Sequence, residues 1–241
     1  MIHNFAVEIR RNLQEFKNFR TNIILANIGF LLLFWGIADF SSQDIRVNVL
    51  LLFTWYCSIH GVDCTAYILE DEIMDRTIAG VVASKFGLYS VVLIRNAVQF
   101  IFDLLKAGII FTIIVLFSGV SVTITFGGFC SIVLSIIVMY LLGLCIGSFA
   151  LIFKRVSSIA SLVHYFVLFF SGIVSDIEFL SFLFPFRFLR GVLTSAVEYT
   201  PIRGSDIVIL FLQAIIYAIV GILLMKWNLK RMYLKGSVAH V

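Results

Sequence analysis

Six long apolar runs limit what this chain can fold into. A bilayer core about 30 Å thick takes roughly 20 apolar residues per helical span, and candidate runs lie at about 22–39, 47–69, 96–118, 124–152, 156–174 and 206–226. The chain is 61% hydrophobic and only 13% charged, so it could not cover its own surface in water. The sequence predicts an all-α integral membrane protein with six transmembrane helices in a single domain, residues 1–241.

The Lys and Arg residues predict how the spans are oriented. Thirteen of the 18 fall on one side if the N-terminus, the 70–95 loop, the 153–156 loop and the C-terminus share that side. Four fall on the other side, and Lys106 lies within a span. Because short cytoplasmic loops carry an excess of Lys and Arg, we expect a multi-pass protein of the cell membrane with both termini in the cytoplasm.

Residues 1–21 predict an amphipathic helix ahead of the first span. Phe5, Ile9, Leu13 and Phe16 recur at helical spacing on one face, and basic residues occupy the polar side. Such a helix is suited to lie along the cytoplasmic membrane interface. A helical extension that packs on other protein is the alternative.

The segment at 175–205, between the fifth and sixth runs, is too apolar for a free loop and too broken for a span. Pro185 and Pro201 both lie in it. We expect two short helices that re-enter the outer leaflet and are separated near Pro185 or near Arg190 and Gly191. An interfacial cover over the outer mouth of the bundle is the alternative.

Enzyme motifs are missing from the sequence. It contains no G-x-x-x-x-G-K-[ST], no H-E-x-x-H and no G-x-S-x-G. Without a phosphate-binding loop the chain cannot hydrolyse ATP by itself in the usual way. We expect no enzyme, no catalytic residues and no cofactor on this chain, and no nucleic-acid partner. Any active transport must then draw its energy from a partner subunit or an ion gradient.

The most charged short segment, "EDEIMDRTIAGVVASKFG" at 70–87, separates the second and third runs. Acids at its start and Lys85 near its end complement the dipole of a helix. A short cytoplasmic helix of this kind, amphipathic but too short to span, is suited to dock into a groove of another protein.

The same segment resembles a motif in the membrane subunit of type 2 ATP-binding-cassette exporters. In that family a pattern close to E-x-x-x-G-T-L-E-x-L-x-x-S-P follows the second span, and a basic residue opens the third span about eleven positions after the Ser. The matching positions here are Glu72, Thr77, Ile78, Val81 or Val82, Ser84 and Arg95. Three positions depart from the pattern, where the family has Gly, Glu and Pro: Arg76, Ala79 and Lys85.

The resemblance, whose topology covers nearly the whole chain, implies that residues 70–87 form a coupling helix on a separate ATPase subunit. The residues implied in this contact are Asp71, Glu72, Arg76, Thr77, Ile78, Val81, Val82 and Ser84. It also implies a homodimer, or a dimer with a related permease, and two ATPase copies that hold ATP and Mg. The cargo would be exported, and the aromatic-rich spans suit an amphipathic, lipid-like or peptide substrate that moves across or out of membrane lipid.

Charged residues inside spans are costly and point to function or to pairing. Asp103 and Lys106 are three residues apart on one helical face and can pair. Asp63 in the second span and Asp103 in the third lie at similar depths, roughly 10 Å from the near ends of their spans. We expect a buried cluster of Asp63, Asp103 and Lys106, either as an ion pair that joins the two spans or as part of a proton relay.

His60 and His164 lie near the middles of the second and fifth runs. The family resemblance makes both of them candidates for the translocation path. Cys57 and Cys64 share a face of the span with His60, but zinc usually takes four ligands. We therefore expect packing residues here and no metal.

Gly143 and Gly147 have the small-x-x-x-small spacing that lets two helices approach closely. We expect these glycines to serve helix packing within the subunit.

Two other classes of protein compete with the exporter subunit. An ion-coupled secondary transporter or channel would use the intramembrane acids, Lys106 and the histidines, although no repeat or pair of broken helices is visible. A non-transporting immunity or regulatory protein would need no coupling helix. Dependence on ATP hydrolysis by a partner separates the three.

Overall fold

The computed structural model describes residues 2–18, 21, 25, 27–29, 31–32, 44–84, 87–119, 122–153, 155–170 and 181–234. Its elements are α1 (Ile2–Asn18), α3 (Ile45–Met74), α4 (Ile78–Ala83), α5 (Gly87–Ser118), α6 (Phe126–Gly147), α7 (Ala150–Phe153), α8 (Ser157–Phe170), the 3-10 turn η1 (Ser181–Leu183), α9 (Phe186–Val197) and α10 (Gly204–Leu234). No strand occurs within these ranges. The described part of the chain is all-helical, as predicted.

Four helices are long and apolar enough to cross a membrane. They are α3, α5, α6 with its continuation through α7, and α10, and they match the second, third, fourth and sixth predicted runs. The shorter α8 covers most of the fifth run, and most of the first run lies outside the described residues. The chain is thus a multi-pass membrane protein, and the number of six spans stays a prediction.

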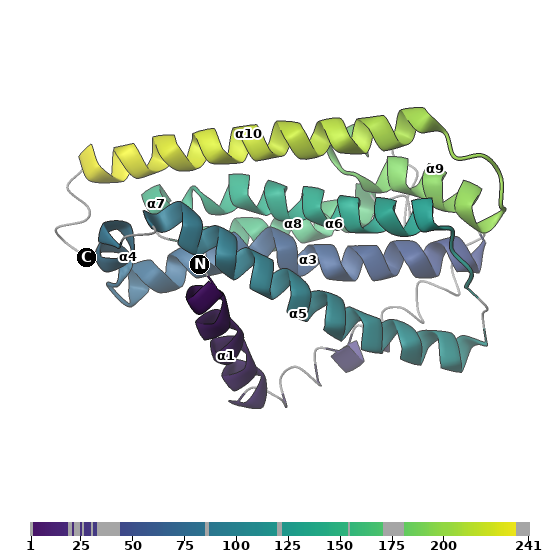
Figure 1. Ribbon diagram of the computed structural model, residues 1–241, viewed down its shortest axis with the longest axis horizontal. Helices are drawn as coiled ribbons and strands as arrows, with labels where there is room; N and C mark the ends of the chain where they lie inside the picture. Colours follow the sequence, from purple (N-terminus) through teal and green to yellow (C-terminus); the bar gives the residue numbers. More distant parts are fainter. Residues whose placement is uncertain are drawn as a thin grey trace.

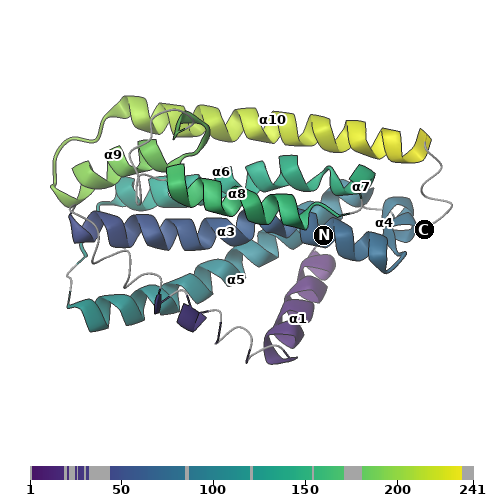
Figure 2. The ribbon, with the colours of Figure 1, turned by 180° about the vertical axis from the view of Figure 1, so that it is seen from behind.

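The long helices lie side by side along the longest axis of the molecule (Figures 1 and 2). One end holds α4, α7 and the end of α10, and we call it the α4 end. The opposite end, which we call the α9 end, holds α9 and the starts of α3, α6 and α10. The predicted 70–95 and 153–156 loops therefore share one end. The helix α1 packs on α5 and lies obliquely beside the bundle.

A local cap fixes the start of α3 at the α9 end. The Asp44 carboxylate accepts a hydrogen bond from the Arg46 backbone N–H at 3.0 Å, and the Arg46 guanidinium donates to it at 2.7 Å. These bonds satisfy an N–H group that the first helical turn leaves without a partner. The side-chain bond to Arg46 also lowers the pKa of Asp44 from its ordinary value of 3.8.

Glycines let α3 and α6 pack almost backbone to backbone. A Cβ added at Gly143 would lie 2.9 Å from Cα of Val62, and one added at Gly147 would lie 2.6 Å from the backbone N of Ala66. Real Cβ atoms essentially never come this close. The predicted packing role of Gly143 and Gly147 is confirmed, and the partner is α3.

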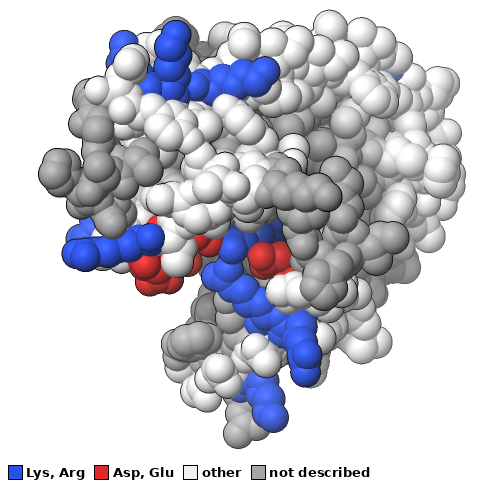
Figure 3. All heavy atoms as spheres, turned by 60° about the vertical axis from the view of Figure 1, so that its left-hand side comes forward, with Lys and Arg blue, Asp and Glu red and all other residues white. Residues whose placement is uncertain are grey.

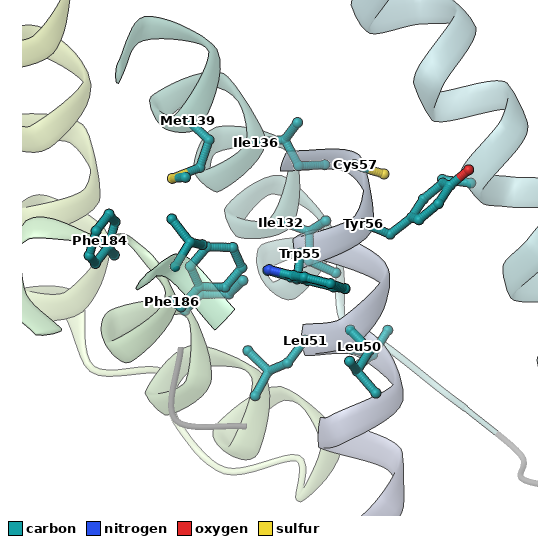
Figure 4. Close-up of a cluster of buried hydrophobic side chains, with 14 of the residues drawn as sticks. Leu50, Leu51, Trp55, Tyr56, Cys57, Ile132, Ile136, Met139, Phe184 and Phe186 are labelled. Atoms are coloured by element: carbon teal, nitrogen blue, oxygen red, sulfur yellow. The ribbon is translucent and has the colours of Figure 1, made fainter. Parts of the chain in front are cut away.

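The main apolar core forms where α3, α6 and α9 meet. Figure 4 shows Trp55 of α3 and Phe186 of α9 pointing toward one another, with Ile136 and Met139 of α6 on the same side. Ile136, Met139 and Phe186 are fully buried. Burial is uneven among the spans, because 72% of the apolar window of α3 is buried and only 17% of that of α10. Thus α3 is the central helix and α10 a peripheral one.

The described part of the predicted external segment is a helix folded onto the bundle. α9 follows Pro185 and continues through Arg190 and Gly191, so of the two expected break points the chain uses Pro185. Its apolar side packs against α3, α6 and α10. Gln213 and Tyr217 of α10 donate hydrogen bonds to the carbonyls of Phe182 and Leu183, at 2.7 and 2.5 Å. Residues 175–180 lie outside the described residues, and re-entry into the leaflet stays a prediction.

Candidate functional site at the α4 end

The segment predicted as one helix over 70–87 is divided by a turn. Residues 70–74 are the last turn of α3, and α4 begins at Ile78. Between them Arg76 adopts a φ of 59°, in the left-handed region that few residues other than glycine occupy. The Thr77 N–H then donates to the Glu72 carbonyl at 3.0 Å. The left-handed residue stops α3 and turns the chain, which leaves α4 as a separate helix of six residues.

The predicted contact residues differ widely in exposure. Ile78 is only 1% exposed and belongs to an apolar cluster with Leu69, Ile73 and Leu88. Val81 and Val82 are half-buried against the same cluster. Four other predicted residues are exposed, together with two unassigned neighbours: Asp71, Arg76, Thr77 and Ser84, with Ala79 and Gly80. The face of α4 that a partner could reach is thus made by small and polar side chains.

Glu72, the remaining predicted contact residue, lies in a buried ion network. It is 7% exposed, and its Oε1 accepts from Arg95 Nη1 of α5 at 2.6 Å. Its Oε2 accepts a short bond from the Thr77 hydroxyl. The Arg95 Nε donates in turn to Glu8 Oε1 of α1 at 2.9 Å. One carboxylate therefore links the end of α3 to the α4 turn, to α5 and, through Arg95, to α1.

A second carboxylate, Glu70, holds the start of α8. Its Oε1 accepts the backbone N–H groups of Val156, in a short bond, and of Ser157 at 2.6 Å. A helix leaves its first N–H groups unsatisfied, and a carboxylate there also complements the helix dipole. Neither Glu8 nor Glu70 stands out in the sequence, because their partners lie 87 and 86 residues away. Glu70 belongs to the charged segment at 70–87, and nothing in the sequence distinguishes it from the neighbouring acids Asp71 and Glu72.

Asp103 and Lys106 pair as predicted, at 3.1 Å between Nζ and Oδ1. Asp103 is 1% exposed and also accepts hydrogen bonds from Gln99 at 2.9 Å and from the Tyr140 hydroxyl of α6 at 2.8 Å. Asp63 lines a cavity beside this group, and Gln99 is another residue of that lining. The predicted pair of Asp103 and Lys106 is thus present, and the Asp103 carboxylate links α5 to α6. That Asp63 joins them in one cluster stays a prediction.

Of the two candidate path histidines, the structure describes the side chain of His60 only. His60 lies with its ring edge-on to Tyr56, at 5.6 Å between ring centroids, and it lines the same cavity as Asp63. His164 is in α8, but its side chain is outside the described residues. The path assignment of both stays a prediction. In the part of the chain that the structure describes, no group of three or more His, Cys, Asp or Glu side chains could hold a metal ion.

Two hollows adjoin these networks. A cavity of about 240 Å³, which we call the polar cavity, is lined by Glu8, Arg11, Asn12, His60, Asp63, Cys64, Tyr67, Ile68, Asp71, Arg95 and Gln99. An open groove of about 580 Å³, which we call the α4 groove, is lined by Glu8, Arg76, Thr77, Gly80, Val81, Ser84, Val91 and Arg95. Figure 3 shows this end of the molecule, where acidic side chains lie between basic ones near the middle of the face. The α4 groove gives the exposed side of α4 a concave neighbour.

No model of a known protein family matches the chain, and no curated protein matches it either.

Proposed function

We propose that this chain is the membrane-spanning subunit of an ATP-binding-cassette exporter, and that the exposed side of α4 and the α4 groove dock a separate ATPase subunit. Two ATPase copies would hold ATP and Mg, and a second permease copy would complete the assembly. The observation that carries the proposal is the bonding of α4: the helix lies at one end of the spans, and Thr77, the residue before it, donates to Glu72, which is paired with Arg95 of α5.

Bonds of this kind can transmit a movement of the ATPase subunit to the helices of the membrane subunit. A load applied to α4 reaches the end of α3 through Ile78 and through the Thr77–Glu72 bond. From Glu72 it reaches Arg95 of α5, and from Glu70 it reaches the start of α8. Hydrogen bonds that involve an ionised group are roughly twice as strong as neutral ones. Movement of α4 should therefore move the three helices α3, α5 and α8 together.

The conformation of Arg76 adds separate support. This residue occupies the position at which the exporter motif has glycine, and its φ is 59°. Glycine enters the left-handed region without the steric cost that a Cβ imposes. The chain therefore has at this position the backbone geometry that the motif's glycine favours. An amphipathic, lipid-like or peptide cargo is the corresponding proposal for the substrate.

A pair of matched glycine variants tests the docking. A Cβ at Gly80 would have no atom within 4 Å, so Gly80→Glu should leave the subunit folded while it places bulk and charge on the docking side. We expect this variant to lose the ATPase that co-purifies with the tagged wild-type chain in mild detergent. Gly204→Glu is the control, because Gly204 is equally open but lies at the α9 end.

The same preparation distinguishes the competing functions. An ATPase chain with a phosphate-binding loop, recovered with the wild type and with Gly204→Glu but not with Gly80→Glu, would support the proposal. If no ATPase accompanies the wild type, the chain is not the partner of an ATPase. If Gly80→Glu retains the ATPase fully, α4 is not the docking element. Ile78→Asp is unsuitable for this test, because it would bury a charge in the subunit itself.

A further inference from the structure

The last turns of α10, at the α4 end, carry a group of basic and aromatic side chains. Lys226, Trp227, Lys230 and Arg231 are all exposed, and at these spacings they lie on one side of two successive helical turns. We call this group the α10 basic face. Figure 3 shows basic side chains over the end of α10, at the top of the view, whereas the acidic side chains lie lower.

The opposite side of the same turns is packed on the bundle. Met225 and Met232 are buried there, and the Asn228 side-chain amide donates to Ser148 Oγ at 3.1 Å. The contacts of α10 with α6 and α7 therefore fix how these turns are rotated. The α10 basic face points away from the protein as a result.

No acid offsets the charge of the α10 basic face within the described residues. The sequence has no Asp or Glu after Asp206, and the ion pairs among the described side chains do not involve Lys226, Lys230 or Arg231. A fourth base, Lys235, follows in the sequence. Four or more basic residues that directly follow a transmembrane helix attract anionic lipid headgroups.

The contact between Arg231 and Trp227 positions one of these charges. The Arg231 Cζ atom lies 3.5 Å from the centroid of the Trp227 ring. At this separation the planar guanidinium lies on the face of the ring, so its N–H groups point outward in their own plane and remain free to donate. A guanidinium held in this way presents a fork of donors that matches two oxygens of one phosphate.

The preceding turns of the same side of α10 are apolar and exposed. Ile219 and Leu223 are 54% and 59% exposed and lie seven and three residues before Lys226. Tryptophan is enriched where the hydrocarbon core of a bilayer meets the headgroups, and Trp227 lies where the apolar side ends. One side of α10 thus offers an apolar surface that leads directly to a cationic one.

We propose that the α10 basic face binds the phosphate of an anionic phospholipid, whose acyl chains lie along Ile219 and Leu223. Arg231 donates to two phosphate oxygens, and Lys226 and Lys230 supply further positive charge. The apolar side that leads to the face is the reason that a lipid fits better than a soluble anion. This site needs no ATPase partner, so its test can fail without affecting the docking proposal.

Competition between two lipids tests the site. The full chain, purified in detergent, is supplied with equal amounts of phosphatidylglycerol and phosphatidylcholine of matched acyl chains, and retained lipid is measured by native mass spectrometry. We expect preferential retention of phosphatidylglycerol. Lys230→Gln and Arg231→Gln should each lower the ratio of the two lipids about fivefold, which is what one basic residue contributes near an anionic surface. Both side chains are exposed, so the variants should fold.

Two further variants separate a positioned site from net charge. Arg203→Gln removes the same charge just before α10 at the α9 end, and it should leave the ratio unchanged. Trp227→Leu keeps every charge but removes the ring that holds Arg231, so it should lower the ratio. Equal retention of both lipids by the wild type, an unchanged ratio in both charge variants, or an equal drop in Arg203→Gln would overturn the proposal. An unchanged ratio in Trp227→Leu would contradict the positioning of Arg231.

A last arm distinguishes a lipid from a soluble anion. Glycerol 3-phosphate has the charged group of phosphatidylglycerol but no acyl chains, so it should not displace the retained lipid from the wild-type chain. If it displaces phosphatidylglycerol at concentrations similar to those of the intact lipid, the apolar side of α10 contributes nothing. The occupant would then be a soluble anion, and the lipid proposal would be wrong.

Discussion

Glu70 and Glu72 are two residues apart on α3 and bind different parts of the molecule. Glu70 faces the start of α8, whereas Glu72 faces Arg95 of α5. Residues that are two positions apart in a helix are rotated by about 200° around its axis, so their side chains face nearly opposite directions. Both carboxylates are at most 9% exposed, and each has charged or N–H partners that offset its burial. The last turn of α3 is therefore fixed from both sides.

Arg95 should be the most sensitive residue of this network. Arg95→Gln leaves Glu8 and the buried Glu72 without their cation, and breaking a buried ion pair costs about 3 kcal/mol. We expect a lower free energy of unfolding in detergent, with partial recovery in Arg95→Lys because lysine restores the charge but not the fork of donors. Arg46→Gln breaks an exposed pair and serves as the control. Equal effects of Arg95→Gln and Arg46→Gln would contradict the buried network.

At Arg76, in contrast to Arg95, a substitution by glycine should raise the free energy of unfolding. Its left-handed conformation costs a residue with a Cβ about 1 kcal/mol relative to glycine, so Arg76→Gly should raise the free energy of unfolding by up to that amount. Arg76→Val should lower it, because a β-branched residue is least tolerated at positive φ. Thermal unfolding of the two variants against the wild type measures both shifts. A loss of stability in Arg76→Gly would show that the arginine side chain contributes more than its backbone strain removes.

At the scale of elements, close approach of α3 and α6 is what organises the bundle. The glycines of both helices contribute, since Gly61 lies under the ring of Tyr140 and Gly143 and Gly147 lie against the backbone of α3. Tyr140 then reaches Asp103 of α5 with its hydroxyl. Thus α6 packs on α3 without side chains between the two backbones, and it is hydrogen-bonded to α5. Small residues favour this arrangement because lipid supplies no hydrophobic force between helices.

Adding one methyl group at this contact should be enough to disturb it. Gly143→Ala would force the backbones of α3 and α6 apart, and overpacking of this kind costs about 1–3 kcal/mol. Gly108→Ala makes the same chemical change in α5, where a Cβ has no atom within 4 Å. We expect a lower unfolding temperature for Gly143→Ala only. A drop of similar size in both variants would refute the close contact.

For the whole molecule, the two ends of the bundle should face opposite sides of the membrane. Ser84 is exposed at the α4 end and Ser205 at the α9 end. In a Cys130→Ser background, which removes the exposed native thiol, Ser84→Cys should react with an impermeant maleimide only from the cytoplasmic side. Ser205→Cys should react only from the outside. Labelling of both from one side would overturn the proposed orientation.

Much of the architecture could be predicted from the sequence, because long apolar runs and the charged segment at 70–87 between two of them are local signals. The four spans and the packing role of Gly143 and Gly147 belong to this class. The bonds of Glu8 and Glu70 do not, because a carboxylate's partner depends on tertiary packing across more than 80 residues. The sequence also did not predict the break before α4, because it depends on an arginine in a backbone conformation that glycine usually adopts.

The cap that Glu70 provides has a consequence for how the sequence can change over evolution. Glu70 binds backbone N–H groups, so the side chains at 156 and 157 could be replaced without loss of its bonds. Related chains should therefore keep an acid at position 70 while the residues it caps drift independently. The contact between Glu8, Arg95 and Glu72 joins side chain to side chain, and there a change at one position would call for a compensating change at the others.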